Sequence, residues 1–495
     1  MEKIAILGQP PGECKKTMLF NSIEFAIFLP IVFFLYWFVI NKNLKAQNLL
    51  VLISSYIFYG WWDWRFLSLI IFSSFTDYSV GIALSKEKNS TKRKLLLLTS
   101  IFVNIGFLGF FKYWNFFAES FADAFTLFGN NFEPDRLNII LPVGISFYTF
   151  QTLSYSIDVY RRKVEPTKDI IAFFSFVSFF PQLVAGPIER ATNLLPQFYI
   201  KRQFDYKKAV DGMRQILWGL FKKMVIADNC AGFVNDFFAN SADYSGSALL
   251  LGAIFFAFQI YCDFSGYSDI AIGTARLLGF NLMRNFAFPY FSRDIAEFWR
   301  RWHISLSTWF RDYVYIPLGG SRGDCWMKTR NTFVVFLVSG FWHGANWTFI
   351  AWGFINALYF LPLLLLKQNR RHTNNVAEGR LFPNIKELLQ ICATFFITVI
   401  AWIFFRAENI NHALVYISNM FSASLFSLPQ IGSKRLIYLI LIFVSIEWLQ
   451  RGKQHALQID NIPFPKLLRW GMYYAIITIS FRLGENQQTF IYFQF

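Results

Sequence analysis

Long apolar runs are the feature of this sequence that most restricts its fold. Among them are EFAIFLPIVFFLYWFVI, LLVLISSYIFYGWW, LLLLTSIFVNIGFLGFF and WTFIAWGFINALYFLPLLLL. A helix needs about 20 apolar residues to cross a bilayer, and several of these runs approach or reach that length. Only helices and closed barrels satisfy every backbone polar group in lipid, and runs this long favour helices. The sequence therefore predicts an all-α polytopic membrane protein.

We expect about eleven transmembrane helices at about 20 residues each. The expected spans include segments that polar residues interrupt, near residues 138–160, 211–232, 333–345 and 470–481. The stretch 171–186 is apolar but broken at Pro181 and Pro187, and basic residues follow it. We interpret it as a re-entrant segment that enters from the cytoplasmic face and returns to it.

The basic loops set the expected orientation in the membrane. The net charge is +16, and Lys and Arg gather in short loops such as KEKNSTKRK at 86–94. Cytoplasmic loops are enriched in these residues, so the charge needs no nucleic-acid partner. Counting spans back from this loop places the N-terminus outside the cytoplasm of a bacterial plasma membrane.

The sequence predicts a single domain over residues 18–495. The longest polar stretch, residues 367–380, is too short to form a domain. Residues 1–17 show no periodicity, and we expect them to be a disordered or non-native tail. The cysteines are scattered without a C-x-x-C pair, and no H-x-x-H occurs, so no disulfide framework, metal site or bound cofactor is indicated.

His303 lies in EFWRRWHISLSTWFRDYVYIPLGG, residues 297–320. On one continuous helix from Arg293, an aromatic stripe would lie beside a cationic stripe that holds Arg300, His303 and Arg311. One interpretation is an interfacial helix with tryptophans among lipid headgroups. The other is a polar entrance for an anionic acyl donor such as coenzyme A, with His303 near the chemistry. Spacing alone leaves both open.

His343 lies deeper, between TFVVFLV and WTFIAWGF. On a continuing helix, Ser339 and Asn346 share its face and would orient the imidazole. We assign both of them, with Trp342, to substrate or donor binding. The alternative for His343 is a structural hydrogen bond between helices. As a neutral imidazole it suits the role of general base for a hydroxyl group.

Other polar residues give weaker signals. His372, His412 and His455 lie in or beside polar loops, and we expect them at the solvated surface. Asp263 and Asp269 suit either a pore lining or hydrogen bonds between helices. The segment LGGSRG, residues 318–323, suits a glycine turn better than a phosphate site.

No nucleophile elbow of the G-x-S-x-G type is present, so direct attack of an alcohol on a thioester fits the histidines best. The two histidine blocks, EFWRRWHISLSTWFRDYVYIPLGG and SGFWHGANWTFIAWG, resemble the membrane-bound O-acyltransferase family, in particular its bacterial alginate O-acetylation branch. The similarity continues through SFYTFQTLSYSIDVYR, FFPQLVAGPIER and FQIYCDFSGYSDIAIG.

The resemblance implies helices around a central pore, with His343 and His303 at the two active-site positions of the family. It implies an acyl thioester donor, such as acetyl-CoA, arriving from the cytoplasm. It also implies a periplasmic or membrane-tethered esterase-like acetyltransferase partner that places the acetyl group on an extracytoplasmic polysaccharide. A transporter, or a non-catalytic membrane scaffold of a polysaccharide-modification complex, is the alternative.

Overall fold

A computed structural model describes residues 18–126, 129, 136–184, 186–429, 434–459, 465–484, 488 and 490–491. The predicted tail, residues 1–17, lies outside this range. Throughout the described residues the regular structure is helical, which confirms the all-α prediction. The chain divides into two compact units, the first being Met1–Val184, Ile188–Phe204 and Leu278–Phe280, and the second Ala185–Pro187, Asp205–Leu277 and Asn281–Phe495.

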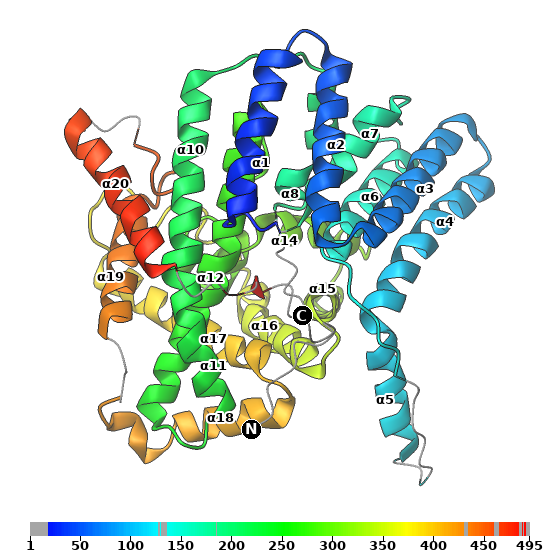
Figure 1. The fold of residues 1–495 in the computed structure, drawn as a ribbon. Coiled ribbons are helices and arrows are strands. Elements are labelled where there is room, and N and C mark those ends of the chain that lie inside the picture. Colours follow the sequence, from blue (N-terminus) through cyan, green and yellow to red (C-terminus); the bar gives the residue numbers. More distant parts are fainter. Residues whose placement is uncertain are drawn as a thin grey trace. The chain divides into compact units, whose positions relative to one another are not determined.

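The first unit begins with long helices and ends with short ones (Figure 1). Its elements are α1 (Ile23–Phe34), η1 (Leu35–Val39), α2 (Leu44–Asp63), η2 (Trp64–Phe66), α3 (Leu67–Lys86), α4 (Ser90–Leu108), η3 (Gly109–Tyr113), α5 (Trp114–Thr126), α6 (Ile145–Tyr160), α7 (Ile170–Ser178), α8 (Phe180–Leu183), α9 (Ala191–Leu194) and η4 (Leu195–Phe198).

The second unit carries both histidine blocks. Its elements are α10 (Tyr206–Phe221), η5 (Lys222–Ala227), α11 (Asp228–Ala239), α12 (Gly246–Leu277), η6 (Pro289–Phe291), α13 (Ile295–Arg301), α14 (Ile304–Phe310), η7 (Arg311–Tyr315), α15 (Cys325–His343), α16 (Trp347–Leu365), α17 (Ile385–Arg406), α18 (Ile410–Met420), η8 (Ala423–Phe426), α19 (Lys434–Leu449) and α20 (Lys466–Leu483).

Five helical stretches of the described chain are long and apolar enough to cross a membrane. They are Leu44–Lys86, Ser90–Thr126, Gly246–Leu277, Trp347–Leu365 and Ile385–Arg406. The first contains two helices of 20 residues each, α2 and α3, separated by η2. The predicted polar-interrupted segments form α6, α10, α15 and α20, which are not among the five. The expected total of about eleven spans therefore stays a prediction.

The expected re-entrant segment is a broken helix. Helix α7 ends at Ser178, Phe179 takes a non-helical conformation, and α8 begins again with Pro181 in its first turn. Proline is favoured there because its missing N–H would have no partner in the first turn of a helix. The predicted break is thus confirmed, while the membrane face from which the segment enters stays a prediction.

Helix α12 is the most buried of the five candidate spans. It packs against α10 so closely that a methyl group on Gly266 would lie 2.8 Å from the carbonyl oxygen of Gly219. A methyl group on Gly273 would lie 2.5 Å from the carbonyl oxygen of Gly212. Small residues permit this approach between membrane helices. Figure 1 shows the two helices running side by side.

Candidate active site

The segment around His303 is not the continuous helix that we predicted. Helix α13 ends at Arg301, and His303 takes a left-handed conformation with φ 43° before α14 begins. The backbone N–H of Ile304 donates to the carbonyl oxygen of Asn285 at 2.9 Å instead of continuing the helix. The predicted stripes therefore do not form, and both Trp302 and Trp309 are buried rather than interfacial.

Short-range hydrogen bonds hold the His303 imidazole. The ring is 1% exposed, and its Nδ1 lies 3.0 Å from Oδ1 of Asn285. The Ser305 hydroxyl donates to the same oxygen at 2.9 Å, and the amide nitrogen of Asn285 donates to the Ser268 hydroxyl at 3.1 Å. Among the residues that the structure describes, Nε2 of His303 has no hydrogen-bond partner.

Aromatic rings surround the same imidazole. Its centroid lies 4.6 Å from that of Phe264, 6.3 Å from that of Phe286 and 6.2 Å from that of Trp342. Burial lowers the pKa of His303 to about 3, since this environment disfavours the charged form. His303 lies between α13 and α14, outside the candidate spans, and is neutral at physiological pH.

His343 is the last residue of α15 and is 5% exposed. Its ring packs edge-on against Trp352 of α16 at 5.1 Å and against Phe405 of α17 at 5.2 Å. The negative end of the helix dipole lies at this terminus and stabilises positive charge there. The surroundings of His343 thus differ from those of His303.

Trp342 joins the two histidines. Its indole lies 6.2 Å from the His303 ring and 5.0 Å from the His343 ring, measured between centroids. Three residues that we assigned to the site from the sequence therefore meet in one aromatic cluster. This cluster lies inside the second unit and contains the ring nitrogens of both histidines.

Ser339 and Asn346 are arranged differently from our expectation. Ser339 lies one turn before His343 on α15, as predicted. The helix ends at His343, so its face does not extend to Asn346. Asn346 instead caps α16, accepting from the backbone N–H of Thr348 at 2.9 Å and donating to the carbonyl oxygen of Glu408 at 2.9 Å.

Glycines bring α15 and α16 together beside His343. A methyl group on Gly340 would lie 2.2 Å from the carbonyl oxygen of Phe349, and one on Gly353 would lie 2.4 Å from that of Phe336. These distances are far below van der Waals contact, so the two helices touch through their backbones. Gly340 thus permits close helix packing, and the contact fixes the end of α15 that carries His343.

Arg300 and Arg311, the predicted donor-binding residues, have partners within the chain. Arg300 donates to the carbonyl oxygens of Asn369 at 2.7 Å and His372 at 2.6 Å. Arg311 pairs with its neighbour Asp312 at 2.7 Å and stays largely exposed. The two guanidinium groups therefore differ, because within the described part of the chain only that of Arg300 binds a segment distant in sequence.

Other arginines bind the same polar segment. Arg293 and Arg301 both donate to the carbonyl oxygen of Asn374, at 2.7 and 3.2 Å. Arg451 donates to those of Val376 and Ala377, at 2.9 and 2.8 Å. We call Arg293, Arg300, Arg301 and Arg451 the arginine clamp, because together they fasten residues 369–377 to α13 and to the end of α19.

The family model for MBOAT, the membrane-bound O-acyltransferase family, matches residues 56–405, a range that contains both histidine blocks. The chain belongs to the membrane-bound O-acyltransferase family. It is therefore a multi-pass membrane protein and an acyltransferase.

Several curated relatives of this acyltransferase modify polymers. The probable alginate O-acetylase AlgI of Pseudomonas aeruginosa is 40% identical, over 87% of this chain and 82% of that protein. A peptidoglycan O-acetyltransferase of Helicobacter pylori is 32% identical, over 97% of this chain and 98% of its own length. A teichoic acid D-alanyltransferase of Streptococcus thermophilus is 30% identical, over 50% of this chain and 63% of its own length.

Two aspartates of α12 join helices together. Asp269 pairs with Lys222 at 2.6 Å and accepts from Gln215 at 2.7 Å. Asp263 pairs with Lys223 at 2.9 Å. The interpretation as hydrogen-bonding partners between packed helices is confirmed for both.

A glycine turn follows η7, as predicted for 318–323. Gly319 and Gly320 have φ of 106° and 58°, which favours glycine at both positions. Our expectation for His455 was wrong, because this side chain is buried and its Nε2 lies 2.9 Å from Oδ1 of Asp211. The sequence around His455 is polar, and it gave no sign that Asp211 of α10 contacts this imidazole.

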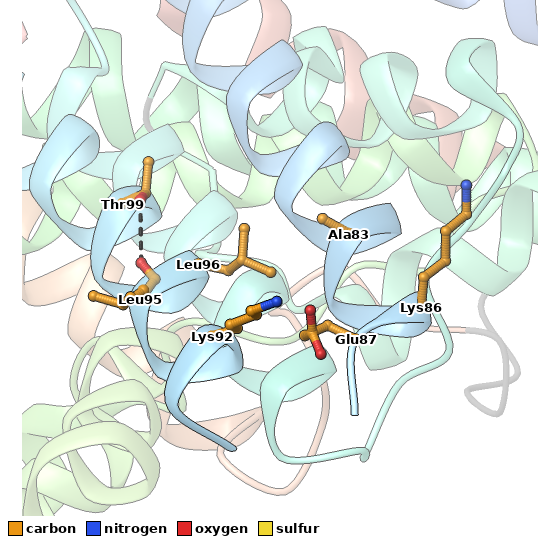
Figure 2. A pocket seen from close by; sticks show the side chains of 7 residues that line it. All are labelled: Ala83, Lys86, Glu87, Lys92, Leu95, Leu96 and Thr99. Atoms are coloured by element: carbon orange, nitrogen blue, oxygen red, sulfur yellow. Dashed lines mark hydrogen bonds between the residues drawn. The ribbon is translucent and has the colours of Figure 1, made fainter. Parts of the chain in front are cut away.

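A separate hollow of about 530 Å³ lies in the first unit, between α3 and α4. Figure 2 shows its lining, in which Lys92 and Glu87 lie near the turn between the helices and Leu96 faces Ala83. Both histidines belong to the second unit, and neither lines this hollow.

Sequence reasoning missed Asn285, Ser268 and Ser305. Ser305 follows His303 by two residues and could have been noticed as a neighbour. Asn285 lies in an irregular segment, and Ser268 lies on α12. No periodic pattern connects either of them with His303.

Proposed function

We propose that this acyltransferase passes an acetyl group from a cytoplasmic thioester, such as acetyl-CoA, across the bacterial plasma membrane. The group then reaches an extracytoplasmic polysaccharide through an esterase-like partner. The names of the O-acetylating relatives, which cover most of the chain, support acetyl as the group and a polymer as the final acceptor. The observation that carries the proposal is the meeting of His303, Trp342 and His343 within the region of the family match.

His343 is the general base of the proposed reaction. It takes the proton of an acceptor hydroxyl as that oxygen attacks the thioester carbonyl and forms the new C–O bond. When the tetrahedral intermediate collapses, the C–S bond breaks and the proton passes to the departing thiolate. The helix terminus favours the transient imidazolium, and the aromatic rings around it keep water from competing for the acyl group.

His303 has a different role in this scheme. With a pKa of about 3 it is poorly matched to proton abstraction at neutral pH. Its Nε2 instead accepts a hydrogen bond and orients a reacting group beside Trp342. Arg300 and Arg311 attract the anionic donor on the cytoplasmic side. Ser339, on α15, and Asn346, at the start of α16, lie beside His343 and help to bind the substrate or donor there.

His343→Ala tests the assignment of the base. We expect transfer from acetyl-CoA by the purified protein to fall by about 10²- to 10⁴-fold, the usual contribution of a general base. The protein should still insert and fold, since one hydrogen bond between membrane helices contributes only about 1 kcal/mol. His412→Ala is the matched control, because His412 lies in the same unit on α18 and is partly exposed. Near-normal transfer by His343→Ala would overturn the proposal.

The double variant His303→Ala, His343→Ala separates an enzyme from a scaffold or transporter. Cells that carry only this variant should lack acetylated polymer although the protein is present in the membrane. Normal acetylation in these cells would favour a non-catalytic role for the chain.

A further inference from the structure

We propose that Asn285 is a positioning residue that holds His303 in the tautomer with the proton on Nδ1. Nε2 is then left with the ring's available lone pair, turned toward the aromatic cluster. The effect of this tautomer on catalysis rests on the proposed function, whereas the tautomer itself does not.

The orientation of the Asn285 amide follows from its partners. A backbone N–H can only donate, and that of Ser305 lies 3.4 Å from the atom assigned as Oδ1. The Ser268 hydroxyl accepts from the other end of the amide at 3.1 Å. The oxygen of Asn285 therefore faces His303. Since this oxygen can only accept, Nδ1 of His303 must carry the hydrogen that joins them at 3.0 Å.

The backbone holds the same pair together. Ile304 donates to the carbonyl oxygen of Asn285, and Ala287 donates to that of Arg301, both at 2.9 Å. These bonds draw residues 285–287 against the break between α13 and α14. They keep His303 in its left-handed conformation, which is strained for a non-glycine residue and persists only because the surroundings hold it.

A small polar cavity lies behind Asn285. Its volume is about 10 Å³, roughly the space of one water molecule, and its lining includes Asn285, Ser268, Lys222, Asp269, Arg284 and Glu447. Hydrogen bonds, rather than close apolar packing, therefore set the orientation of the Asn285 amide on this side. A substitution at Asn285 that removes these hydrogen bonds also removes the constraint on the His303 ring.

The charged groups around His303 do not contact its ring directly but lie beyond the residues that do. The ring itself touches aromatic side chains of α12, of α15 and of the segment before η6. The titratable groups on the packed elements are Lys222, Asp269, Arg284, Glu447 and His455 around the cavity, Lys223, Asp228 and Asp263 beyond Phe264, and His343 beyond Trp342. A carboxylate at position 285 would be the first charge to touch the imidazole.

The direct test is the ¹⁵N spectrum of histidine-labelled protein, with the His303 signals assigned by their loss in His303→Gln. We expect Nδ1 to be protonated and Nε2 to be unprotonated from pH 5 to pH 9 in the wild type. In Asn285→Leu we expect a mixture of both tautomers. A wild-type ring protonated on Nε2, or a spectrum unchanged by Asn285→Leu, would overturn the proposal whether or not the protein transfers acetyl groups.

Activity provides the second test. Asn285→Leu should lower kcat at least 10-fold with little change in donor KM. In Asn285→Asp the carboxylate should keep the tautomer but raise the pKa of His303, and a ¹⁵N titration of its ring should place that pKa at least one pH unit higher than in wild type. Asn356→Asp is the matched control, since Asn356 is buried on α16 and donates to the carbonyl oxygen of Trp352. An equal rise of the His303 pKa in Asn356→Asp would assign the effect to general destabilisation and overturn the role of Asn285.

Discussion

The two histidines share one indole and are both buried among aromatic rings, but their backbone positions and polar contacts differ. His303 is enclosed by aromatic rings and held by a neutral amide, so it stays uncharged. His343 closes a long helix, where the dipole favours a positive charge. In the proposed scheme this difference divides the chemistry of the site, with His343 gaining and releasing a proton in each cycle.

The pH profile of transfer should reflect this division. A base must be unprotonated to act, so a single histidine base should make log kcat fall with a slope of one on the acid side of the profile. His303 is already neutral over this range and adds no second proton. Initial rates at saturating donor between pH 5 and pH 9 measure the slope. A slope of two would show that both imidazoles titrate together.

The two arginines proposed to bind the donor provide a separate prediction. Arg311→Gln and Arg300→Gln should each raise the KM for acetyl-CoA more than they lower kcat, because binding shared by ground and transition states is lost. Asp312→Asn is the control for Arg311, since it removes the partner carboxylate without removing the guanidinium. If KM is unchanged in both arginine variants, the donor does not bind there.

At the scale of helices, the backbone contact between α15 and α16 determines where His343 lies. A side-chain methyl at Gly340 would overlap a carbonyl oxygen of α16, which cannot move alone. Gly340→Ala should therefore destabilise the protein by about 1–3 kcal/mol, the usual cost of overpacking. Transfer should also be reduced.

Gly232→Ala is the matched control for that variant. Gly232 lies on α11 in the same unit, with open space where its methyl group would point. The melting temperature of the Gly232→Ala variant in detergent should stay the same or rise slightly, since alanine favours a helix. An equal loss of stability in both variants would mean that the α15–α16 contact is not special.

Sequence patterns predicted these elements with uneven success. Apolar run length is a local property, and the quoted runs at 49–62, 95–111 and 347–366 overlap candidate spans, whereas the run at 24–40 forms only the shorter helical stretch Ile23–Val39. Helical periodicity continued through His303, yet the helix breaks there because Asn285, distant in sequence, supplies the acceptor for Ile304. The same limit applies to Asn346, whose role as a cap depends on where α15 ends. Residue types and blocks were thus predictable, whereas bonds between distant segments were not.

At the scale of the whole molecule, the main prediction is which loops of the protein face the cytoplasm. The basic turn after α3 should face the cytoplasm, and α5 should end outside it. A cysteine at Lys88 should react with an impermeant thiol reagent only after the inner face is opened, and one at Asp123 should react in intact cells. The native cysteines, including the exposed Cys325 and Cys392, must first be replaced. Reaction of both sites from the same side would contradict this topology.

The arginine clamp has a consequence for how this protein tolerates change. Arg293, Arg300, Arg301 and Arg451 bind carbonyl oxygens of residues 369–377, and every residue type supplies such an oxygen. The exposed residues of this segment, such as Arg370, Arg371 and Thr373, can therefore change without loss of these bonds, whereas the length of the segment cannot. In a deep mutational scan, substitutions at Arg370, Arg371 and Thr373 should be nearly silent, whereas a one-residue deletion within 369–377 should be as damaging as loss of an arginine.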